Sequence, residues 1–336
     1  MLLILNKNIT LGEITNMHCF QQMKGQFVFS LIDDWMKEKK DLTLRKLQEQ
    51  TPTWYCEDIL YGLERLEIIA LRERQYVYPV NTGCHLIYLP ADKKKYDFYA
   101  ILMAGGGYGA VCTMVEALPV AAKLNELGID CFCLNYHTAT IESFENGLMP
   151  QPLEDVAEAL RFIQAHELQF GVQADCYIAC GFSAGGHLAA MWGTHHKGAR
   201  HYGIPNPQFL LLNYPLISLM NINAEMGTVI RKGLLGKHFK DVDMIEYSVN
   251  YHVDNLYPRV YMCLAEDDMT VPMQDARDME EALTEAKVPY YIERAPYGGH
   301  GYGLGSATPA KGWVERAIDF GKNPQRFTKG NREGHI

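Results

Sequence analysis

A serine flanked by glycines lies between an apolar segment and a helix-forming segment in the middle of the chain. Residues 176–180 form a short apolar run of the length that a buried parallel strand needs. The chain then turns through residues 181–186, Gly-Phe-Ser-Ala-Gly-Gly, and continues into helix formers at 188–192. A strand, a sharp turn and a helix are the context in which G-x-S-x-G projects a nucleophilic hydroxyl above a sheet. The pattern predicts that Ser183 is a nucleophile. A glycine-rich turn with an idle serine is the alternative.

A second glycine-rich loop, residues 104–109, follows a predicted strand over 98–103. Its sequence is Ala-Gly-Gly-Gly-Tyr-Gly, and consecutive glycines let backbone N–H groups face the oxyanion that develops in acyl transfer. We expect the amides of Gly106 and Gly107 to act with that of Ala184, the residue after the nucleophile. A nucleotide phosphate loop is the alternative. The run lacks both the Lys-Ser/Thr ending and the G-x-G-x-x-G spacing of such loops.

Two further loops supply an acid and a base. Residues 266–268 are three consecutive acids directly after an apolar strand, and residues 298–303 place a lone histidine among glycines. An acid that orients a histidine would explain both loops. The order Ser183, Asp268, His300 is Ser…Asp…His, with separations of 85 and 32 residues that leave room for the intervening elements. His187, on the helix after the nucleophile, is expected to pack rather than to act as the base.

The elements around these loops alternate between strands and helices. Two antiparallel strands are expected at 76–80 and 85–89. Parallel strands are then expected at 98–103, 130–135, 176–180, 209–212, 260–265 and 290–294, with helices at 114–127, 153–166, 188–192, 274–286 and 309–320. Repeated βα units indicate a mostly parallel sheet flanked by helices, with its site at the carboxyl ends of the strands. We expect a catalytic domain over 76–322, a lid or pocket wall over 218–256 and a polar tail over 323–336.

Residues 1–75 have a different pattern and are expected to form a helical accessory segment. Helices are predicted at 27–40, 43–50 and 54–70. A tight break between short helices suggests a helix-turn-helix, but ten basic against eleven acidic residues leave no basic stripe for DNA. The apolar positions of this segment exceed what three short helices can bury among themselves. We therefore expect them to face the catalytic domain or another subunit, so a homodimer is one expectation.

Composition narrows the classes of partner. A net charge of −9 argues against nucleic acid or an anionic membrane surface, and no apolar run approaches the ~20 residues of a membrane span. The apolar run at residues 1–5 is too short for a signal peptide. The nine cysteines do not have the regular spacing of a disulfide framework or a metal site, which indicates free thiols in a reducing compartment. We therefore expect a cytoplasmic protein and no metal site.

The residues from about 76 to 320 resemble the α/β-hydrolase fold. Within it they resemble the esterase/lipase branch related to bacterial acetyl-xylan and feruloyl-type carbohydrate esterases. The motifs that carry the resemblance are GGGY at 105–108, LNYH at 134–137, PLED at 152–155, GFSAGGHLA at 181–189, D-x-x-V-P at 268–272 and GGHG at 298–301. Two residues depart from the branch: Ala104 replaces a proline or histidine, and His137 replaces an arginine that bears on pocket polarity. The D-x-x-V-P motif favours Asp268 over Asp267 as the acid.

The resemblance implies a serine carboxylic-ester hydrolase that uses Ser183, Asp268 and His300 and needs no cofactor or metal. It also implies a small-molecule ester as substrate, with a small acyl group such as acetyl on a sugar or other small alcohol. Tyr108, Tyr297 and Tyr302 lie beside the motifs and could stack on a sugar face, or they could be core residues. Two alternatives remain open at this point. The motifs describe acyl transfer rather than a leaving group, so a peptidase or amidase fits them as well, and a non-catalytic binding protein would retain the fold.

Overall fold

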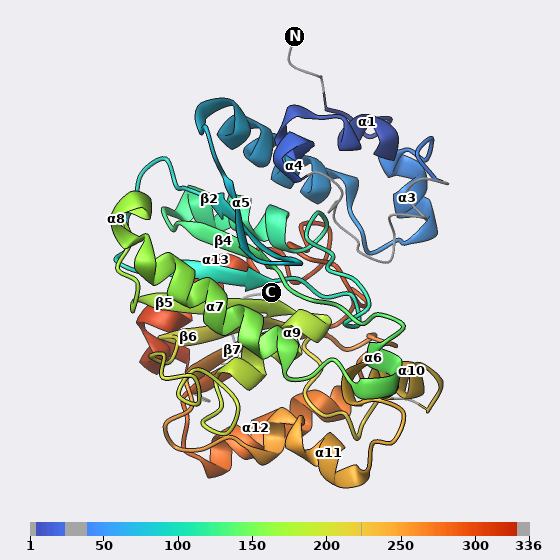
Figure 1. Ribbon diagram of the computed structural model, residues 1–336, viewed down its shortest axis with the longest axis vertical. Coiled ribbons are helices and arrows are strands. Elements are labelled where there is room, and N and C mark those ends of the chain that lie inside the picture. The colour runs from blue at the N-terminus through green and yellow to red at the C-terminus, as the bar shows by residue number, and fades with distance from the viewer. Residues whose placement is uncertain (1–4, 24–38, 223, 328–336) are drawn as a thin grey trace.

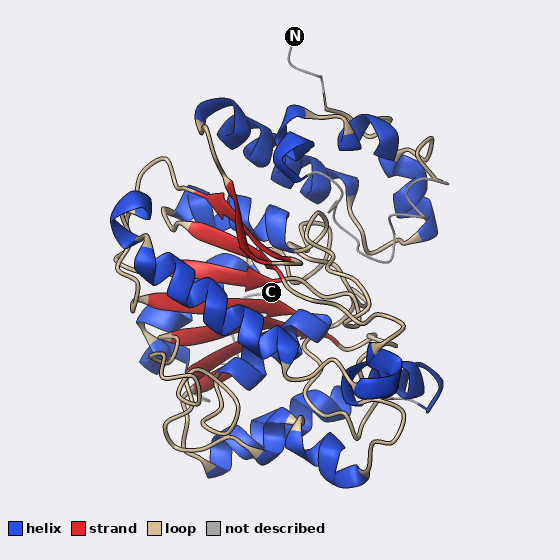
Figure 2. Cartoon of the chain, viewed as in Figure 1, coloured by secondary structure: helices blue, strands red, loops and turns tan. Residues whose placement is uncertain are grey.

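A single mostly parallel sheet forms the centre of the molecule (Figures 1 and 2). The computed structural model describes residues 5–23, 39–222 and 224–327. Their strands are β1 (Val77–Asn81), β2 (Cys84–Leu89), β3 (Tyr99–Met103), β4 (Cys131–Asn135), β5 (Tyr177–Phe182), β6 (Phe209–Asn213), β7 (Arg259–Ala265) and β8 (Tyr290–Ala295). They lie in the order β1-β2-β4-β3-β5-β6-β7-β8. β2 pairs antiparallel with both β1 and β4, and every other neighbouring pair is parallel. The predicted α/β-hydrolase fold class is confirmed.

Helices cover both faces of this sheet. In Figure 1, α7 (Gln151–Ala165) and α9 (Ser183–Trp192) lie on one face, and α5 (Ala117–Leu127) and α13 (Trp313–Lys322) lie on the other. α8 (Glu167–Phe170) follows α7, and α12 (Met273–Glu285) connects β7 to β8. Because both faces are covered, the central strands are apolar throughout, and all five residues of β3 and of β6 are buried.

Close packing between the central strands and α9 requires glycine. A Cβ at Gly185 would lie 2.1 Å from the carbonyl oxygen of Met103, and one at Gly181 would lie 2.3 Å from the carbonyl oxygen of Gly185. A side chain at either position would therefore separate α9 from β3 and β5. The small residues around Ser183 are explained by this contact.

The described residues of the N-terminal segment are largely helical, and the longest of their helices, α4 (Cys56–Arg72), packs on the helical layer of the sheet. The others are α1 (Leu11–Thr15), η1 (His18–Met23) and α3 (Leu44–Gln50). α4 lies against α5, where a Cβ at Gly62 would be 2.7 Å from the backbone nitrogen of Pro119. Leu63, Leu66 and Ile69 of its apolar stripe are buried. Most of the helix predicted over 27–40, and most of the predicted tail over 323–336, lie outside the described residues. The division into domains and the homodimer stay predictions.

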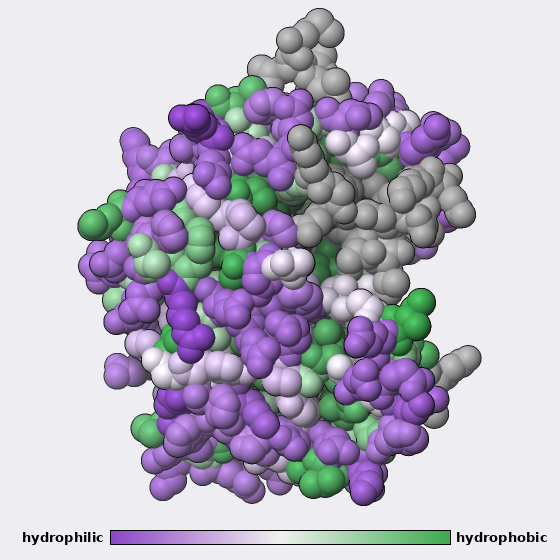
Figure 3. Space-filling model, in the orientation of Figure 1, coloured by the Kyte–Doolittle hydropathy of each residue, from purple (hydrophilic) through white to green (hydrophobic). Residues whose placement is uncertain are grey.

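The interval 218–256, which interrupts the βα pattern, contains helical structure. It contains α10 (Ala224–Leu235), α11 (Asp241–Glu246) and the 3₁₀ helix η2 (Val249–Tyr251). α10 packs beside α6 (Ser143–Asn146), a short helix that the sequence did not predict (Figure 1). Phe144 of α6 and Val229 of α10 are exposed apolar side chains. Polar and apolar side chains are mixed on the surface over this part of the molecule (Figure 3).

Two helices begin later than predicted. The helix predicted from Met114 begins at Ala117, because residues 111–116 form turns in which Cys112 donates its N–H to the carbonyl of Gly105 at 2.9 Å. The helix predicted from Pro309 begins at Trp313, after turns that include the 2.9 Å bond from the Trp313 N–H to the carbonyl of Ala310. Within the described residues, no helix combines the length and the apolar character needed to cross a membrane.

Candidate active site

Ser183 occupies a strained position between β5 and α9. It is the first residue of α9, and its φ of 51° lies in the left-handed region that non-glycine residues rarely adopt. The carbonyl oxygen of Ser183 accepts a 3.1 Å hydrogen bond from the N–H of Leu216, which follows β6. Strain of this kind persists only where the surrounding structure imposes it, and it is common at functional sites. This is the backbone geometry expected of a nucleophile elbow.

Two hydrogen bonds connect Ser183, His300 and Asp268. His300 Nε2 lies 2.7 Å from Ser183 Oγ, and His300 Nδ1 lies 2.7 Å from Asp268 Oδ2. A carboxylate can only accept at Nδ1, so that nitrogen carries the proton and Nε2 is left to accept from the serine hydroxyl. The other carboxylate oxygen of Asp268 accepts from the N–H groups of Thr270 and Val271 at 2.8 and 3.0 Å. The structure thus brings together the three residues that the sequence singled out.

Asp267 binds a different part of the same loop. Its Oδ1 accepts hydrogen bonds from the N–H groups of Gly298 and Gly299, both at 2.8 Å. These glycines directly precede His300. Asp267 therefore holds the backbone that carries the imidazole, whereas Asp268 contacts the imidazole itself.

The glycine loop after β3 lies beside the nucleophile. A Cβ at Gly105 would lie only 2.7 Å from the Cβ of Ser183. Gly106 has a φ of 125°, and a Cβ there would lie 2.3 Å from the carbonyl oxygen of Ala110, so only glycine fits the turn. Among the described residues, the N–H groups of Gly106, Gly107 and Ala184 donate no hydrogen bond. These three amides are the ones that the sequence suggested for an oxyanion hole.

Glu116 and Tyr214 connect the glycine loop to the histidine loop, and the sequence did not single out either residue. Glu116 Oε2 accepts from the N–H of Gly105 at 2.5 Å, and Glu116 Oε1 accepts from the hydroxyl of Tyr214 at 3.0 Å. The Tyr214 oxygen in turn accepts from the N–H of Gly303 at 2.9 Å. Burial raises the pKa of Glu116 to about 7, against the lowering effects of the Gly105 amide, the charge of His300 and the Tyr214 hydroxyl. In the sequence, the one feature that could have pointed to Glu116 is its position as a single acid within an apolar run.

His187 is a packing histidine, as expected. Its Nε2 lies 2.6 Å from the carbonyl oxygen of Tyr247, and its Nδ1 lies 2.7 Å from the hydroxyl of Tyr108. Because a carbonyl only accepts, Nε2 carries the proton and Nδ1 accepts from Tyr108. Burial lowers the pKa of His187 to about 4, so the ring is neutral. Both ring nitrogens are occupied away from Ser183.

The three candidate tyrosines differ in exposure. Tyr108 and Tyr302 are 1% and 2% exposed, and the hydroxyl of Tyr302 contacts Cys263 Sγ at 3.4 Å. These two rings are core residues, so the hypothesis that they stack on a sugar is corrected: packing leaves neither face to a ligand. Tyr297 is 58% exposed and precedes the histidine loop. It is the candidate of the three with a free surface.

The two departures from the motif pattern have structural partners. The carbonyl oxygen of Ala104 accepts from the hydroxyl of Tyr136 at 2.6 Å. His137 contacts Asp155 of α7 through Nδ1 at 2.9 Å and the carbonyl oxygen of Thr82 through Nε2 at 2.7 Å. The polar atoms of His137 are therefore directed to α7 and to the β1–β2 turn.

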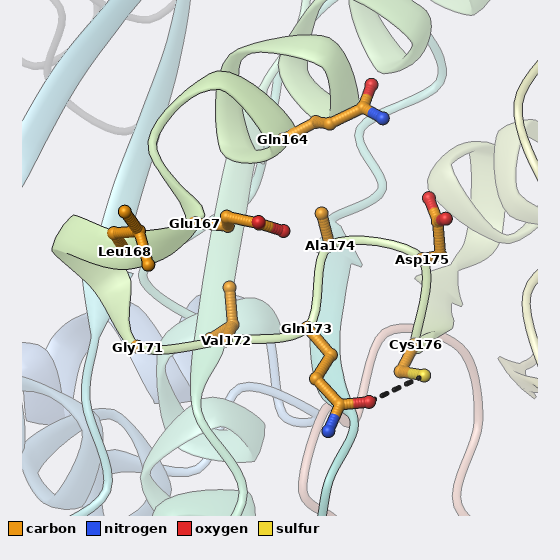
Figure 4. A pocket seen from close by; sticks show the side chains of 9 residues that line it. All are labelled: Gln164, Glu167, Leu168, Gly171, Val172, Gln173, Ala174, Asp175 and Cys176. Atoms are coloured by element: carbon orange, nitrogen blue, oxygen red, sulfur yellow. Dashed lines mark hydrogen bonds between the residues drawn. The ribbon is translucent and has the colours of Figure 1, made fainter.

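A hollow of about 410 Å³ lies at the opposite end of β5 from Ser183 (Figure 4). Its lining residues are Gln164, Glu167, Leu168, Gly171, Val172, Gln173, Ala174, Asp175 and Cys176. The hydrogen bond drawn there joins Cys176 Sγ to Gln173 Oε1 at 3.4 Å. The hollow is not lined by Ser183, Asp268 or His300. No group of three or more histidine, cysteine or acidic side chains suited to a metal ion occurs among the residues that the structure describes.

Comparison with known proteins connects this geometry to a family. The family model BD-FAE matches residues 86–283, more than half of the chain, a range that includes Ser183 and Asp268 but not His300. Acetylxylan esterase of Xylanibacter ruminicola is 30% identical over 210 residues, covering 60% of this chain and 40% of that protein. Endo-1,4-beta-xylanase B of Butyrivibrio fibrisolvens is 26% identical over 294 residues, covering 84% of this chain and 43% of that protein. The chain thus spans less than half the length of either relative.

A solved structure agrees with the fold. The acetyl ester-xyloside bifunctional hydrolase of Caldicellulosiruptor lactoaceticus superimposes with a TM-score of 0.61 at 29% identity, covering 73% of this chain and 89% of that chain. The chain has an α/β-hydrolase fold and belongs to the BD-FAE family.

Proposed function

We propose that the protein hydrolyses carboxylic esters through a triad of Ser183, His300 and Asp268. The observation that carries this proposal is the continuous pair of 2.7 Å contacts from Ser183 Oγ to His300 Nε2 and from His300 Nδ1 to Asp268 Oδ2. A serine, a histidine and an acid in this connectivity activate the hydroxyl for attack on a carbonyl. The names of the relatives support an ester as the substrate.

The proposed reaction has two steps. Ser183 Oγ attacks the ester carbonyl carbon while its proton passes to His300 Nε2, and Asp268 stabilises the resulting imidazolium. His300 then gives this proton to the departing alkoxide, which leaves as the alcohol. In the second step a water molecule gives a proton to His300 and attacks the acyl-enzyme, and the carboxylic acid departs as Ser183 recovers its proton. At the end of the second step His300 and Ser183 have returned to their starting protonation states.

The amides of Gly106, Gly107 and Ala184 are proposed to stabilise the tetrahedral oxyanion in both steps. Each such donor typically contributes about 3–4 kcal/mol to the transition state. Glu116 supports this arrangement indirectly, because it binds the adjacent Gly105 amide and, through Tyr214, the loop of His300. We therefore assign Glu116 a positioning role between the two loops.

The proposed substrates are acetyl or other small acyl esters of sugars or small alcohols. The support is the resemblance to carbohydrate esterases and the similarity to the 30% identical relative, an acetylxylan esterase. The side chain of Ile230 on α10 approaches the glycine loop after β3. Its Cδ1 is 4.0 Å from the position that a Cβ at Gly107 would occupy. This proximity supports the proposal that α10 forms a wall of the acyl pocket. A cytoplasmic location is also proposed, because all nine cysteines are free thiols.

A substrate panel tests the proposal. Hydrolysis of p-nitrophenyl esters of increasing acyl length, and of acetylated sugars, should be abolished in Ser183→Ala, which serves as the blank. Two substrates with the same acyl group, one an ester and the other an amide, distinguish esterase activity from amidase or peptidase activity. Hydrolysis of the amide without the ester would identify an amidase or peptidase. Failure of a fluorophosphonate probe to label Ser183 would favour a binding protein over an enzyme.

A further inference from the structure

Residues Thr53 and Trp54 of the N-terminal segment contact the loop that carries His300. A Cβ at Gly299 would lie 3.0 Å from Thr53 Cγ2, and a Cβ at Gly301 would lie 3.4 Å from Trp54 Nε1. These two glycines flank His300 directly. Residues from the beginning of the chain therefore pack against the backbone on both sides of the proposed base. The match to the family model begins only at residue 86, after this segment.

Asp58 anchors the far end of the same loop. It lies in the first turn of α4, is 4% exposed, and its Oδ2 accepts from the N–H of Ser306 at 3.1 Å. Burial raises the pKa of the Asp58 carboxyl, and its hydrogen bonds with Ser306 oppose that shift. A buried carboxyl without donors is costly, so this bond specifies where the end of the loop lies.

The histidine loop needs such external support because of its composition. It contains five glycines between 298 and 305, all with φ in the left-handed region, and each lacks the side chain that would restrict its backbone. The body of the protein holds this loop at Gly298 and Gly299 through Asp267, and at Gly303 through Tyr214. The side facing α4 is held by Thr53, Trp54 and Asp58. In Figure 1 the loops that precede α13 lie beneath the helices of the N-terminal segment.

We propose that three residues of the N-terminal segment, Thr53, Trp54 and Asp58, position His300 for proton transfer. This inference rests on the proposed function, in which His300 is the base. Its consequence is kinetic: when the segment's contacts are removed, His300 spends less time within hydrogen-bond distance of Ser183. The rate of chemistry should then fall while substrate binding changes little, because these residues support the base.

Asp58→Ala tests the proposal, with Glu57→Ala as its matched control. Glu57 is the neighbouring acid of the same helix turn, is exposed, and pairs with Lys7. We expect Asp58→Ala to lower kcat for p-nitrophenyl acetate by about 10- to 100-fold with KM within about twofold, since small misplacements of catalytic groups have effects of this size. Asp58→Asn should restore most of the activity because its amide oxygen can still accept from Ser306. Glu57→Ala should match the wild type.

A second variant tests the proposal in case the Asp58→Ala protein does not fold. Thr53→Gly deletes the contact with Gly299 at a half-buried position and should lower kcat severalfold with a near-unchanged melting temperature. In both variants, labelling of Ser183 by a small fluorophosphonate should slow in proportion to kcat, because it depends on the same activated hydroxyl. Folded Asp58→Ala and Thr53→Gly proteins with wild-type kcat and labelling would overturn the inference and leave the proposed function intact. A wild-type protein that neither hydrolyses esters nor labels at Ser183 would overturn both.

Discussion

Asp267 and Asp268 are adjacent in the sequence, but their carboxylates hold different parts of the histidine loop. Asp268 contacts the imidazole of His300 at 2.7 Å, whereas Asp267 accepts from the amides of Gly298 and Gly299. Asp268 therefore orients the imidazole of His300, and the neighbouring Asp267 orients the backbone that carries it. The sequence motif favoured Asp268, and the contacts agree with that preference.

This division of roles predicts unequal effects for two matched substitutions. Asp268→Asn should lower kcat by several orders of magnitude, about 10⁴ in the general case, because an amide favours the wrong histidine tautomer. Asp267→Asn keeps an acceptor oxygen for both glycine amides and should cost less than about tenfold. Steady-state kinetics on p-nitrophenyl acetate distinguishes them. The reverse ranking would transfer the acid's role to Asp267.

Glu116 predicts a pH dependence of stability. Its pKa is raised from 4.5 to about 7 by burial, so between these values the folded protein holds a proton that the unfolded chain has lost. Stability therefore falls as the pH rises through this window. Glu116→Gln removes the titration, so the unfolding free energy of the variant relative to wild type should improve by roughly 3 kcal/mol from about pH 4.5 to 7. Urea unfolding at several pH values measures this. A difference that does not change with pH would contradict the assignment.

Tyr297 is the exposed tyrosine beside the histidine loop and is predicted to contact the alcohol part of a sugar ester. Tyr297→Ala should raise KM for an acetylated sugar by about tenfold, in keeping with the loss of one aromatic contact, while p-nitrophenyl acetate is less affected. Tyr290→Ala is the control, since Tyr290 is the first residue of β8 and lies at the end of that strand away from the loop of His300. Equal KM values for the sugar ester in both variants would remove Tyr297 from the binding site.

Removal of residues 1–75 should destabilise the remainder of the chain. The contact of α4 with α5 and the buried Leu63, Leu66 and Ile69 mean that truncation exposes apolar surface of the hydrolase body. We expect lower solubility or a melting temperature lower by about 10 °C or more. Thermal unfolding, size-exclusion chromatography and kinetics of both forms provide the comparison. A truncated protein of unchanged stability, oligomeric state and kinetics would contradict this expectation.

The parts of the site that the sequence predicted are those specified by local chemistry. The turn at Ser183, the glycines at 105–107 and the loop of His300 each have a pattern within a few residues, and parallel strands bring their ends to one edge. Glu116 and Tyr214 are different, because their role depends on a contact between residues 98 positions apart. The same holds for Asp58 and Ser306, 248 positions apart. Periodicity also placed Glu116 inside a helix, where an isolated acid is normally exposed to solvent.

The central claim is that Ser183 is the nucleophile and His300 its base. The most direct measurement is p-nitrophenyl acetate turnover by wild type, Ser183→Ala, His300→Ala and the double variant, combined with mass spectrometry of the acylated protein. We predict an acyl group on Ser183 in the wild type and a loss of about 10³-fold or more in each single variant. The double variant should be scarcely worse, because the residues act as one unit. An acyl group on another residue, or His300→Ala retaining more than about a tenth of wild-type kcat, would contradict the account.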